Sequence, residues 1–149
     1  MNYARTLIRR TIDGQRSSLT ALRERTQPTH GWIAAIRFAL GISQRVLGGR
    51  LGISKQRLSQ LEHRERQGTI QLEQLQEAAE QLGCDLVYAF VPREPLEKTV
   101  RRQARKVALV QLSAVQRTMQ LEGQETPLTE ERIRDYIDRH IDEKDIWET

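Results

Sequence analysis

The chain has 149 residues, of which 38% are hydrophobic and 30% charged, and its formal net charge is +4. Leucine, isoleucine, valine and phenylalanine make up 37 of them, about 25%, above the roughly 20% below which chains usually stay disordered. We therefore expect one small folded domain with arms. No apolar run reaches the roughly 18 residues that span a bilayer, and Met1–Arg10 has no apolar stretch of the signal-peptide type. A single cysteine excludes intrachain disulfides and cysteine-based zinc sites, so we expect a cytoplasmic chain without a metal.

The charges are distributed unevenly along the chain. Residues 1–30 carry six basic and two acidic groups, and residues 93–117 carry seven basic and two acidic groups. Residues 118–149 carry four basic and ten acidic groups. A basic body with an acidic tail predicts a polyanion as the partner of one part and a different task for the other.

The N-terminal arm, residues 1–28, is predicted to form one helix from Arg5 to Arg25 that ends before Pro28. Gly14 lowers the helix propensity in the middle of this arm. The apolar positions of the helix are Leu7, Ile8, Ile12, Leu19 and Leu22.

A series of short helices follows, and each is bounded by a glycine or by a residue that commonly caps helices. Gly41 ends the first helix, and Ser43, Ser54 and Thr69 are expected to cap the next three. The four helices are expected at residues 32–40, 44–51, 55–61 and 70–82.

The second and third of these helices are joined by Gly52-Ile53-Ser54, as a helix-turn-helix requires. Gly52 allows the positive φ of a tight turn, and Ser54 caps the following helix. Lysine can read guanine and glutamine can read adenine in the major groove, so the outer face of that helix is a candidate reading surface. The plain alternative is a helical hairpin with a solvated polar face.

The segments Arg37–Gln44, Leu51–Ser54 and Leu58–Glu62 together resemble the phage-repressor and Cro-like (XRE) family. The resemblance implies a five-helix DNA-binding domain, which we place at residues 29–83. It also implies a structural ion pair between Arg37 and Glu62. The DNA-binding residues that it suggests are Gln44 at the phosphate backbone and Lys55, Gln56 and Gln60 at base edges. Arg57 and Ser59 can contact either the phosphates or the bases, and Ser54 belongs to the same DNA-binding set.

Two glycines depart from the pattern of that family, which usually has alanine and then a polar residue in their place. Gly48 and Gly49 each cost about 1 kcal/mol against alanine in a helix. Close helix packing at Gly48 would offset part of this cost, so we expect an intact but less rigid motif.

Leu86–Val91, within residues 84–92, is a β-branched and aromatic run closed by Pro92, and it is predicted to be a strand. A lone strand leaves its backbone groups unpaired. Two alternatives remain open: the strand pairs with its symmetry mate as a dimer seam, or it packs against the chain's own arms.

The C-terminal third is predicted to contain two helices. Residues 93–124 hold a long basic helix, Leu96–Met119, and residues 125–149 hold an acidic helix capped by Thr129. The apolar positions are Val100, Ala104, Val107, Ala108, Val115 and Met119 on the first, and Ile133, Ile137, Ile141 and Trp147 on the second. The second stripe either binds a partner or folds back as ordinary core, and folding back is the commoner fate.

Thr118-Met119-Gln120-Leu121-Glu122-Gly123 fits the inhibitory motif of Fic proteins, which is Ser or Thr, three residues, Glu, then Gly or Asn. In that family the glutamate pairs with an active-site arginine that otherwise clamps the γ-phosphate of ATP, a charge-assisted contact. The match implies an inhibitory role for Thr118, Glu122 and Gly123. The pattern also arises by chance in about one chain of this size in ten, in which case Glu122 is a solvated residue near a helix end.

Further segments of the chain carry a second resemblance, namely Gly31–Ile33, Gly68–Ile70, Leu82–Glu94, Gln103–Lys106 and Thr118–Glu122. In these segments the chain resembles the mobile mystery protein A family. Members of that family occur beside mobile mystery protein B, a Fic-domain protein. The resemblance therefore implies an antitoxin that represses its own operon and neutralises a Fic AMP-transferase, either as a homodimer or in a toxin–antitoxin heterocomplex.

The fold class that we predict is all-α, with a lambda-repressor/Cro-like helix-turn-helix domain, flanking helical arms and one short β-strand. The chain shows no nucleophile–base pair, no metal-ligand set and no Gly-rich phosphate loop, so we expect no enzyme activity and no cofactor. A helix-turn-helix repressor without a toxin partner is the alternative function.

Overall fold

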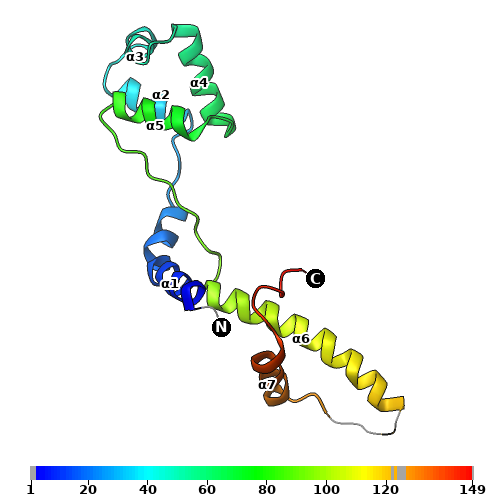
Figure 1. Cartoon of the computed structure of the whole chain (residues 1–149). Coiled ribbons are helices and arrows are strands. Elements are labelled where there is room, and N and C mark those ends of the chain that lie inside the picture. Colours follow the sequence, from blue (N-terminus) through cyan, green and yellow to red (C-terminus); the bar gives the residue numbers. More distant parts are fainter. Residues whose placement is uncertain (1–2, 122, 124–126, 149) are drawn as a thin grey trace. The chain divides into compact units, whose positions relative to one another are not determined.

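Figure 1 shows the computed structural model of the chain, which describes residues 3–121, 123 and 127–148. These residues form seven α-helices and no strand, so the mostly helical class is confirmed. The chain divides into two compact units, Glu24–Ala89 and Met1–Arg23 with Phe90–Thr149. Among the described residues, no helix is both long and apolar enough to cross a membrane.

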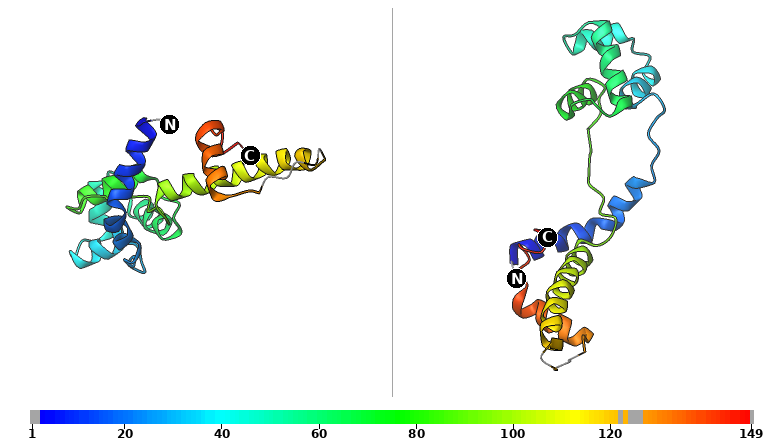
Figure 2. Two further views of the ribbon diagram at one scale, coloured as in Figure 1. Left: turned by 90° about the horizontal axis from the view of Figure 1, so that it is seen from below. Right: turned by 90° about the vertical axis from the view of Figure 1, so that its right-hand side faces the viewer.

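The unit Glu24–Ala89 contains four helices, where five were expected. They are α2 (Trp32–Ala39), α3 (Gln44–Arg50), α4 (Lys55–Gln67) and α5 (Leu72–Gln81). The four helices lie together in Figures 1 and 2. In the small core between them, Leu47 and Leu58 are fully buried. Ile33, Ala78 and Leu82 complete the buried cluster. One side chain from each helix, with Leu82 just after α5, therefore closes the core of this unit.

The caps of two helices are as predicted, and one is not. Ser43 and Ser54 accept hydrogen bonds from backbone N–H groups in the first turns of α3 and α4, each at 3.2 Å. Thr69 does not cap α5, because that helix starts only at Leu72. Ile70 is half-buried against the core, so the chain continues inward past Thr69 before the helix can begin.

The second unit is built on α6 (Leu96–Leu121), against which α1 (Tyr3–Arg23) and α7 (Glu130–His140) pack. Thr129 caps α7, accepting a hydrogen bond from the N–H of Arg132 at 3.3 Å. The apolar stripe of α7 folds back onto α6 as core, the commoner of the two alternatives. The buried residues of this packing are Ala104, Val107, Ala108, Leu112, Ile133 and Ile146.

Two expected core positions are wrong. Trp147 is 57% exposed, and its neighbour Ile146 is fully buried in its place. The helical spacing does not continue past His140, and Gln103 Nε2 fixes the non-helical chain there by donating to the Ile146 carbonyl at 2.7 Å. Val115 is 45% exposed because the packed clusters under α7 end at Leu112.

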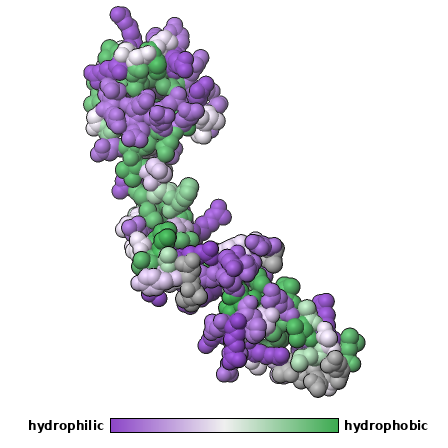
Figure 3. Space-filling view, in the orientation of Figure 1, coloured by the Kyte–Doolittle hydropathy of each residue, from purple (hydrophilic) through white to green (hydrophobic). Residues whose placement is uncertain are grey.

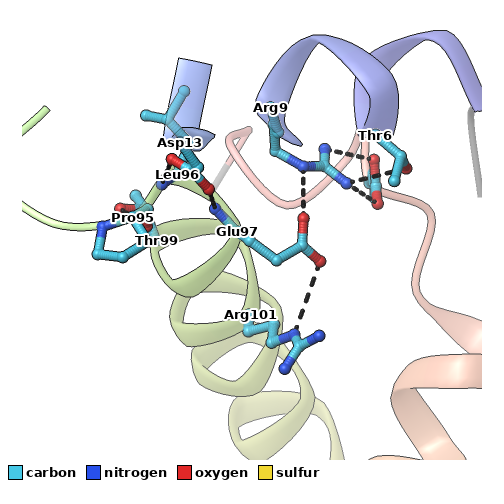
Figure 4. Close-up of polar contacts among 9 residues, drawn as sticks. Thr6, Arg9, Asp13, Pro95, Leu96, Glu97, Thr99 and Arg101 are labelled. Carbon is cyan, nitrogen blue, oxygen red and sulfur yellow. Dashed lines mark hydrogen bonds and ion pairs between the residues drawn. The ribbon is translucent and has the colours of Figure 1, made fainter. Parts of the chain in front are cut away.

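A buried arginine joins three segments of this unit (Figure 4). Arg9 of α1 donates from Nε to Glu97 of α6 at 2.9 Å and from Nη2 to Glu143 at 2.9 Å. The Arg9 guanidinium holds the pKa of the Glu143 carboxyl below its usual range. Beside it, Asp13 caps α6 by accepting from the backbone N–H groups of Leu96, at 2.7 Å, and Glu97, at 3.2 Å. Charged side chains thus fasten α1 to the start of α6.

The strand expected over Leu86–Val91 is not confirmed. Residues 84–92 carry no regular secondary structure in the single chain. A strand needs a neighbouring strand for its backbone groups, and none of the described segments supplies one.

Candidate nucleic-acid interface

The turn between α3 and α4 is short and closed by backbone hydrogen bonds. Gly52 adopts a φ of 69°, in the left-handed region that glycine reaches without steric cost. The N–H of Ile53 donates to the carbonyl of Gly48 at 2.8 Å, and the N–H of Gly52 donates to that of Gly49 at 3.2 Å. These bonds end α3 and fix the direction in which the chain enters α4.

The two glycines of α3 have different surroundings. A Cβ at buried Gly48 would lie 2.9 Å from the carbonyl oxygen of Ile53, closer than real Cβ atoms come to backbone. A Cβ at Gly49 would meet nothing within 4 Å. Gly48 therefore lets the turn lie directly against α3, whereas no contact in the structure explains Gly49.

One side of α4 faces the core and the other faces outward. Leu58, Leu61 and Glu62 are buried on the inner side. None of the exposed residues expected on the outer side uses its side chain in a hydrogen bond or ion pair with the described part of the chain. These residues are Lys55, Gln56, Arg57, Ser59 and Gln60. Their side chains are available to an external partner, and the visible face of the unit is mostly hydrophilic (Figure 3).

Arg37 and Glu62 lie together, with Arg37 Nε 2.6 Å from Glu62 Oε1. Arg37 Nη1 also donates to the carbonyl of Ile42 at 3.1 Å, so the pair ties α2 and the following loop to α4. Gln44 joins the same cluster, because its Nε2 donates to Glu62 Oε2 at 2.9 Å. An amide nitrogen has two N–H donors, so the bond to Glu62 uses one donor of Gln44 and orients the group, and the second donor is left for another acceptor.

A second glutamate of α4 caps α2, which the sequence reasoning missed. Glu65 accepts from the backbone N–H groups of Trp32, at 2.7 Å, and Ile33, at 3.0 Å. A Cβ at Gly31 would lie 2.6 Å from Glu65 Oε2, so glycine is needed there for the carboxylate to approach. The contact joins residues more than 30 positions apart, so no local sequence pattern predicts it.

The exposed basic side chains of this unit lie mainly on α3 and α4, whereas its exposed acidic side chains lie mainly on α5. The basic ones of α3 and α4 are Arg45, Arg50, Lys55, Arg57, Arg64 and Arg66. The two acidic residues of those helices, Glu62 and Glu65, are committed to internal contacts. Helix α5 carries three glutamates and no basic residue. A polyanion is therefore attracted to the α3–α4 side of the unit.

Helix α4 extends six residues beyond its expected end, and this adds a residue to the outer face. His63 is exposed. Gln60 follows Gln56 by four residues and His63 follows Gln60 by three, so the three side chains share one stripe of the helix. Nδ1 of His63 lies 3.3 Å from Nη2 of Arg66. Residues 62–67 contain no glycine or proline, and this absence of a stop was the available signal for the longer helix. Gly68, with a φ of 70°, ends it.

The Fic-like motif lies at the end of α6, in the other unit. Thr118 is exposed, and its Oγ1 donates to the carbonyl of Ala114 at 3.3 Å. Gly123 has a φ of 73° and donates its N–H to the carbonyl of Gln120 at 3.2 Å. Glu122, the residue on which the inhibitory role depends, lies outside the described residues.

Residues 33–88 match the family model described as Helix-turn-helix. The match covers the four helices α2–α5 and the turn between α3 and α4. No curated protein and no solved structure matches the chain. The chain therefore contains a DNA-binding helix-turn-helix domain of the XRE-like type.

Proposed function

We propose that this helix-turn-helix domain represses the operon that encodes the chain, and that the whole chain is the antitoxin of a Fic-type AMP-transferase. The DNA-binding part is supported by one observation above all. Helix α4 is held by a cap and a buried inner face, while five of its outer side chains have no partner in the described chain, namely Lys55, Gln56, Arg57, Ser59 and Gln60. Such a helix enters the major groove with its N-terminal residues against the base edges.

The residues of α4 suit that task chemically. Gln56 and Gln60 lie one turn apart and can each form a bidentate contact with adenine, while Lys55 can contact guanine. The arginines of α3 and α4 then neutralise phosphates on either side. We propose two copies of the domain on two half-sites, as helix-turn-helix proteins commonly bind.

The test replaces two glutamines on α4 and two on α5. We expect Gln56→Ala with Gln60→Ala to abolish sequence-specific protection of the operator, because the base contacts are lost. The matched control is Gln76→Ala with Gln81→Ala, two exposed glutamines of the acidic helix α5, which should leave the footprint unchanged. An unchanged footprint with the α4 variant would refute the assignment of that helix to the groove.

The antitoxin part rests on the resemblance and on the Thr118–Gly123 motif. In this proposal Glu122 pairs with the Fic arginine that would otherwise hold the γ-phosphate of ATP. A bidentate arginine–carboxylate contact is charge-assisted, so it can compete with a phosphate for that arginine. ATP then cannot bind productively, and AMP transfer stops. We propose no catalytic activity for the chain itself.

The test of this part is an AMP-transfer assay with the Fic protein encoded beside the chain. We expect the parent to inhibit, the Glu122→Gly variant to bind without inhibiting, and the neighbouring Glu125→Gly variant to inhibit like the parent. Equal inhibition by all three would mean that the toxin is neutralised by steric cover. If none of them binds, the alternative function, a repressor without a toxin partner, replaces the antitoxin proposal.

The self-contained packing of the C-terminal region favours that alternative in one respect. Helices α6 and α7 bury their apolar faces against each other, so the described part of this unit needs no toxin to complete its core. The binding measurement above separates the two functions.

A further inference from the structure

The extended segment of residues 86–91 has the side chains of a strand but no strand beside it. Val87, Tyr88 and Phe90 are 77%, 71% and 95% exposed. No backbone N–H or carbonyl of residues 86–91 is hydrogen-bonded within the described part of the chain. Hydrophobic side chains are also visible at the surface where the chain leaves the helix-turn-helix unit (Figure 3). Unpaired extended backbone beside exposed apolar side chains is a template for another strand.

We propose that residues 85–93 pair with the same residues of a second copy of the chain, antiparallel and about a two-fold axis at Ala89. In this register Val87 lies opposite the second copy's Val91, and Tyr88 lies opposite its Phe90. The smallest side chain of the segment stands on the axis, where the two copies face the same residue. Pro92 lies opposite Leu86 and ends the ladder, because proline has no N–H to donate.

The charges at the two ends of the segment select this register. Asp85 and Arg93 are exposed, and neither side chain has a partner in the described chain. About an axis at Ala89, Asp85 of each copy lies opposite Arg93 of the other, which gives two cross-strand ion pairs. Parallel pairing would place Asp85 opposite Asp85, and a shift of one residue would place it opposite either Pro92 or Glu94. Opposite charges across a ladder stabilise it and like charges destabilise it.

The alternation of the strand sorts the remaining side chains onto two faces. Tyr88 and Phe90 of both copies gather on one face, and the aliphatic Val87, Ala89 and Val91 gather on the other. Directly opposed aromatic pairs are among the favourable cross-strand contacts. The exposed apolar surface of the single chain is thereby covered by its own symmetry mate.

A second copy is the occupant that fits both the segment and the domain beside it. A two-fold interface uses the same surface on both partners, so the segment must be complementary to itself, as the opposed residues above are. A dimer also presents two α4 helices to two half-sites. Only this second argument rests on the DNA-binding role proposed above, and the experiment is therefore carried out without DNA.

Disulfide trapping tests the register in the full chain with the native thiol removed by Cys84→Ala. Opposed residues of an antiparallel pair have Cα atoms about 4.5–5.5 Å apart, within the range that a disulfide accepts, whereas diagonal neighbours are about 7–8 Å apart. We expect the Ala89→Cys variant to form a disulfide-linked dimer under mild oxidation. The Tyr88→Cys and Phe90→Cys variants should each form no disulfide-linked dimer alone, because neither cysteine then faces another, and should cross-link when mixed.

The control for random collision is Ser17→Cys, an exposed position of α1. If Ala89→Cys cross-links no faster than Ser17→Cys, the pairing is refuted. If Tyr88→Cys alone cross-links as well as the mixture with Phe90→Cys, the register is refuted.

A charge exchange tests the same register without cysteines. We expect Asp85→Arg to raise the dimer dissociation constant, measured by light scattering, by about tenfold, because two arginine pairs then face each other. Adding Arg93→Asp to that variant should restore the dimer, since the ion pairs re-form in reverse. A double variant as weak as the single one would overturn the pairing of these residues. Dimerisation is measured without DNA and operator protection is measured separately, so a failed dimer and a failed DNA-binding role remain distinguishable.

Discussion

Replacing Gly48 or Gly49 by alanine tests how closely the turn packs against α3, because the two positions differ in the space around them. We expect Gly48→Ala to destabilise the unit Glu24–Ala89 relative to Gly49→Ala. The new Cβ at position 48 would lie 2.9 Å from the Ile53 carbonyl oxygen, which is backbone and cannot rotate away. At position 49 the same Cβ meets nothing within 4 Å.

The difference between the two variants isolates the steric cost. Both gain the same helix propensity, about 1 kcal/mol at most this close to the end of α3, and both lose the same freedom in the unfolded chain. Overpacking in a closely packed site costs about 1–3 kcal/mol. Gly49→Ala should therefore stabilise the unit slightly, and Gly48→Ala should be about 1–3 kcal/mol less stable than Gly49→Ala.

Urea unfolding followed by tryptophan fluorescence provides the assay. The chain has two tryptophans, so Trp147→Phe leaves Trp32, at the start of α2, as the reporter of this unit. Trp147 is more than half exposed and belongs to the other unit, so its replacement is a mild background change. If Gly48→Ala were as stable as Gly49→Ala, the close approach of the turn to α3 would not be the reason for glycine at position 48.

Three further predictions concern charges. Arg37→Met should lower the free energy of unfolding of the unit Glu24–Ala89 by about 3 kcal/mol, because the substitution leaves the buried Glu62 carboxylate without its cation. A loss of less than about 1 kcal/mol, measured by urea unfolding, would contradict this prediction. The contact with Arg9 lowers the pKa of Glu143 in the folded chain, so this contact stabilises the fold fully above the unfolded pKa of Glu143 and is lost as the pH falls through the folded pKa. In acid unfolding, the stability of Glu143→Gln should therefore fall less with decreasing pH than that of the parent. Parallel curves of stability against pH for the two proteins would refute this prediction. Operator affinity should fall about a hundredfold between about 50 and 200 mM salt if about four DNA phosphates are contacted. An affinity that does not change with salt would exclude contacts with the phosphates of the DNA.

The chain consists of a helix-turn-helix unit and a second helical unit. The unit Glu24–Ala89 has its own core and carries the outward face of α4. The other unit is assembled from both ends of the chain, since α1 packs against α6 and α6 packs against α7. The sequence predicts these ends as separate arms, because their joining depends on Arg9, Asp13 and their distant partners.

The sequence by itself determined the helix-turn-helix. Its information is local there: Gly52 permits the turn, Ser43 and Ser54 cap the helices that follow them, and the apolar spacing turns Leu47 and Leu58 inward. Interactions between residues three or four positions apart produce recognisable caps and apolar spacings in a sequence. The helices around the turn and the outward face of α4 could therefore be predicted.

Contacts between distant residues were decided only by the tertiary structure. The capping of α2 by Glu65, the burial of Ile146 in place of Trp147 and the fastening of α1 by Arg9 each join segments far apart in the chain. The identity of a glutamate or an isoleucine does not indicate which distant residue it will contact. The contacts that form are those of the packing that buries most apolar surface and gives each buried charge a partner. The same reason applies to Leu86–Val91. A strand is completed by a neighbouring strand, and no other described segment of the single chain supplies one.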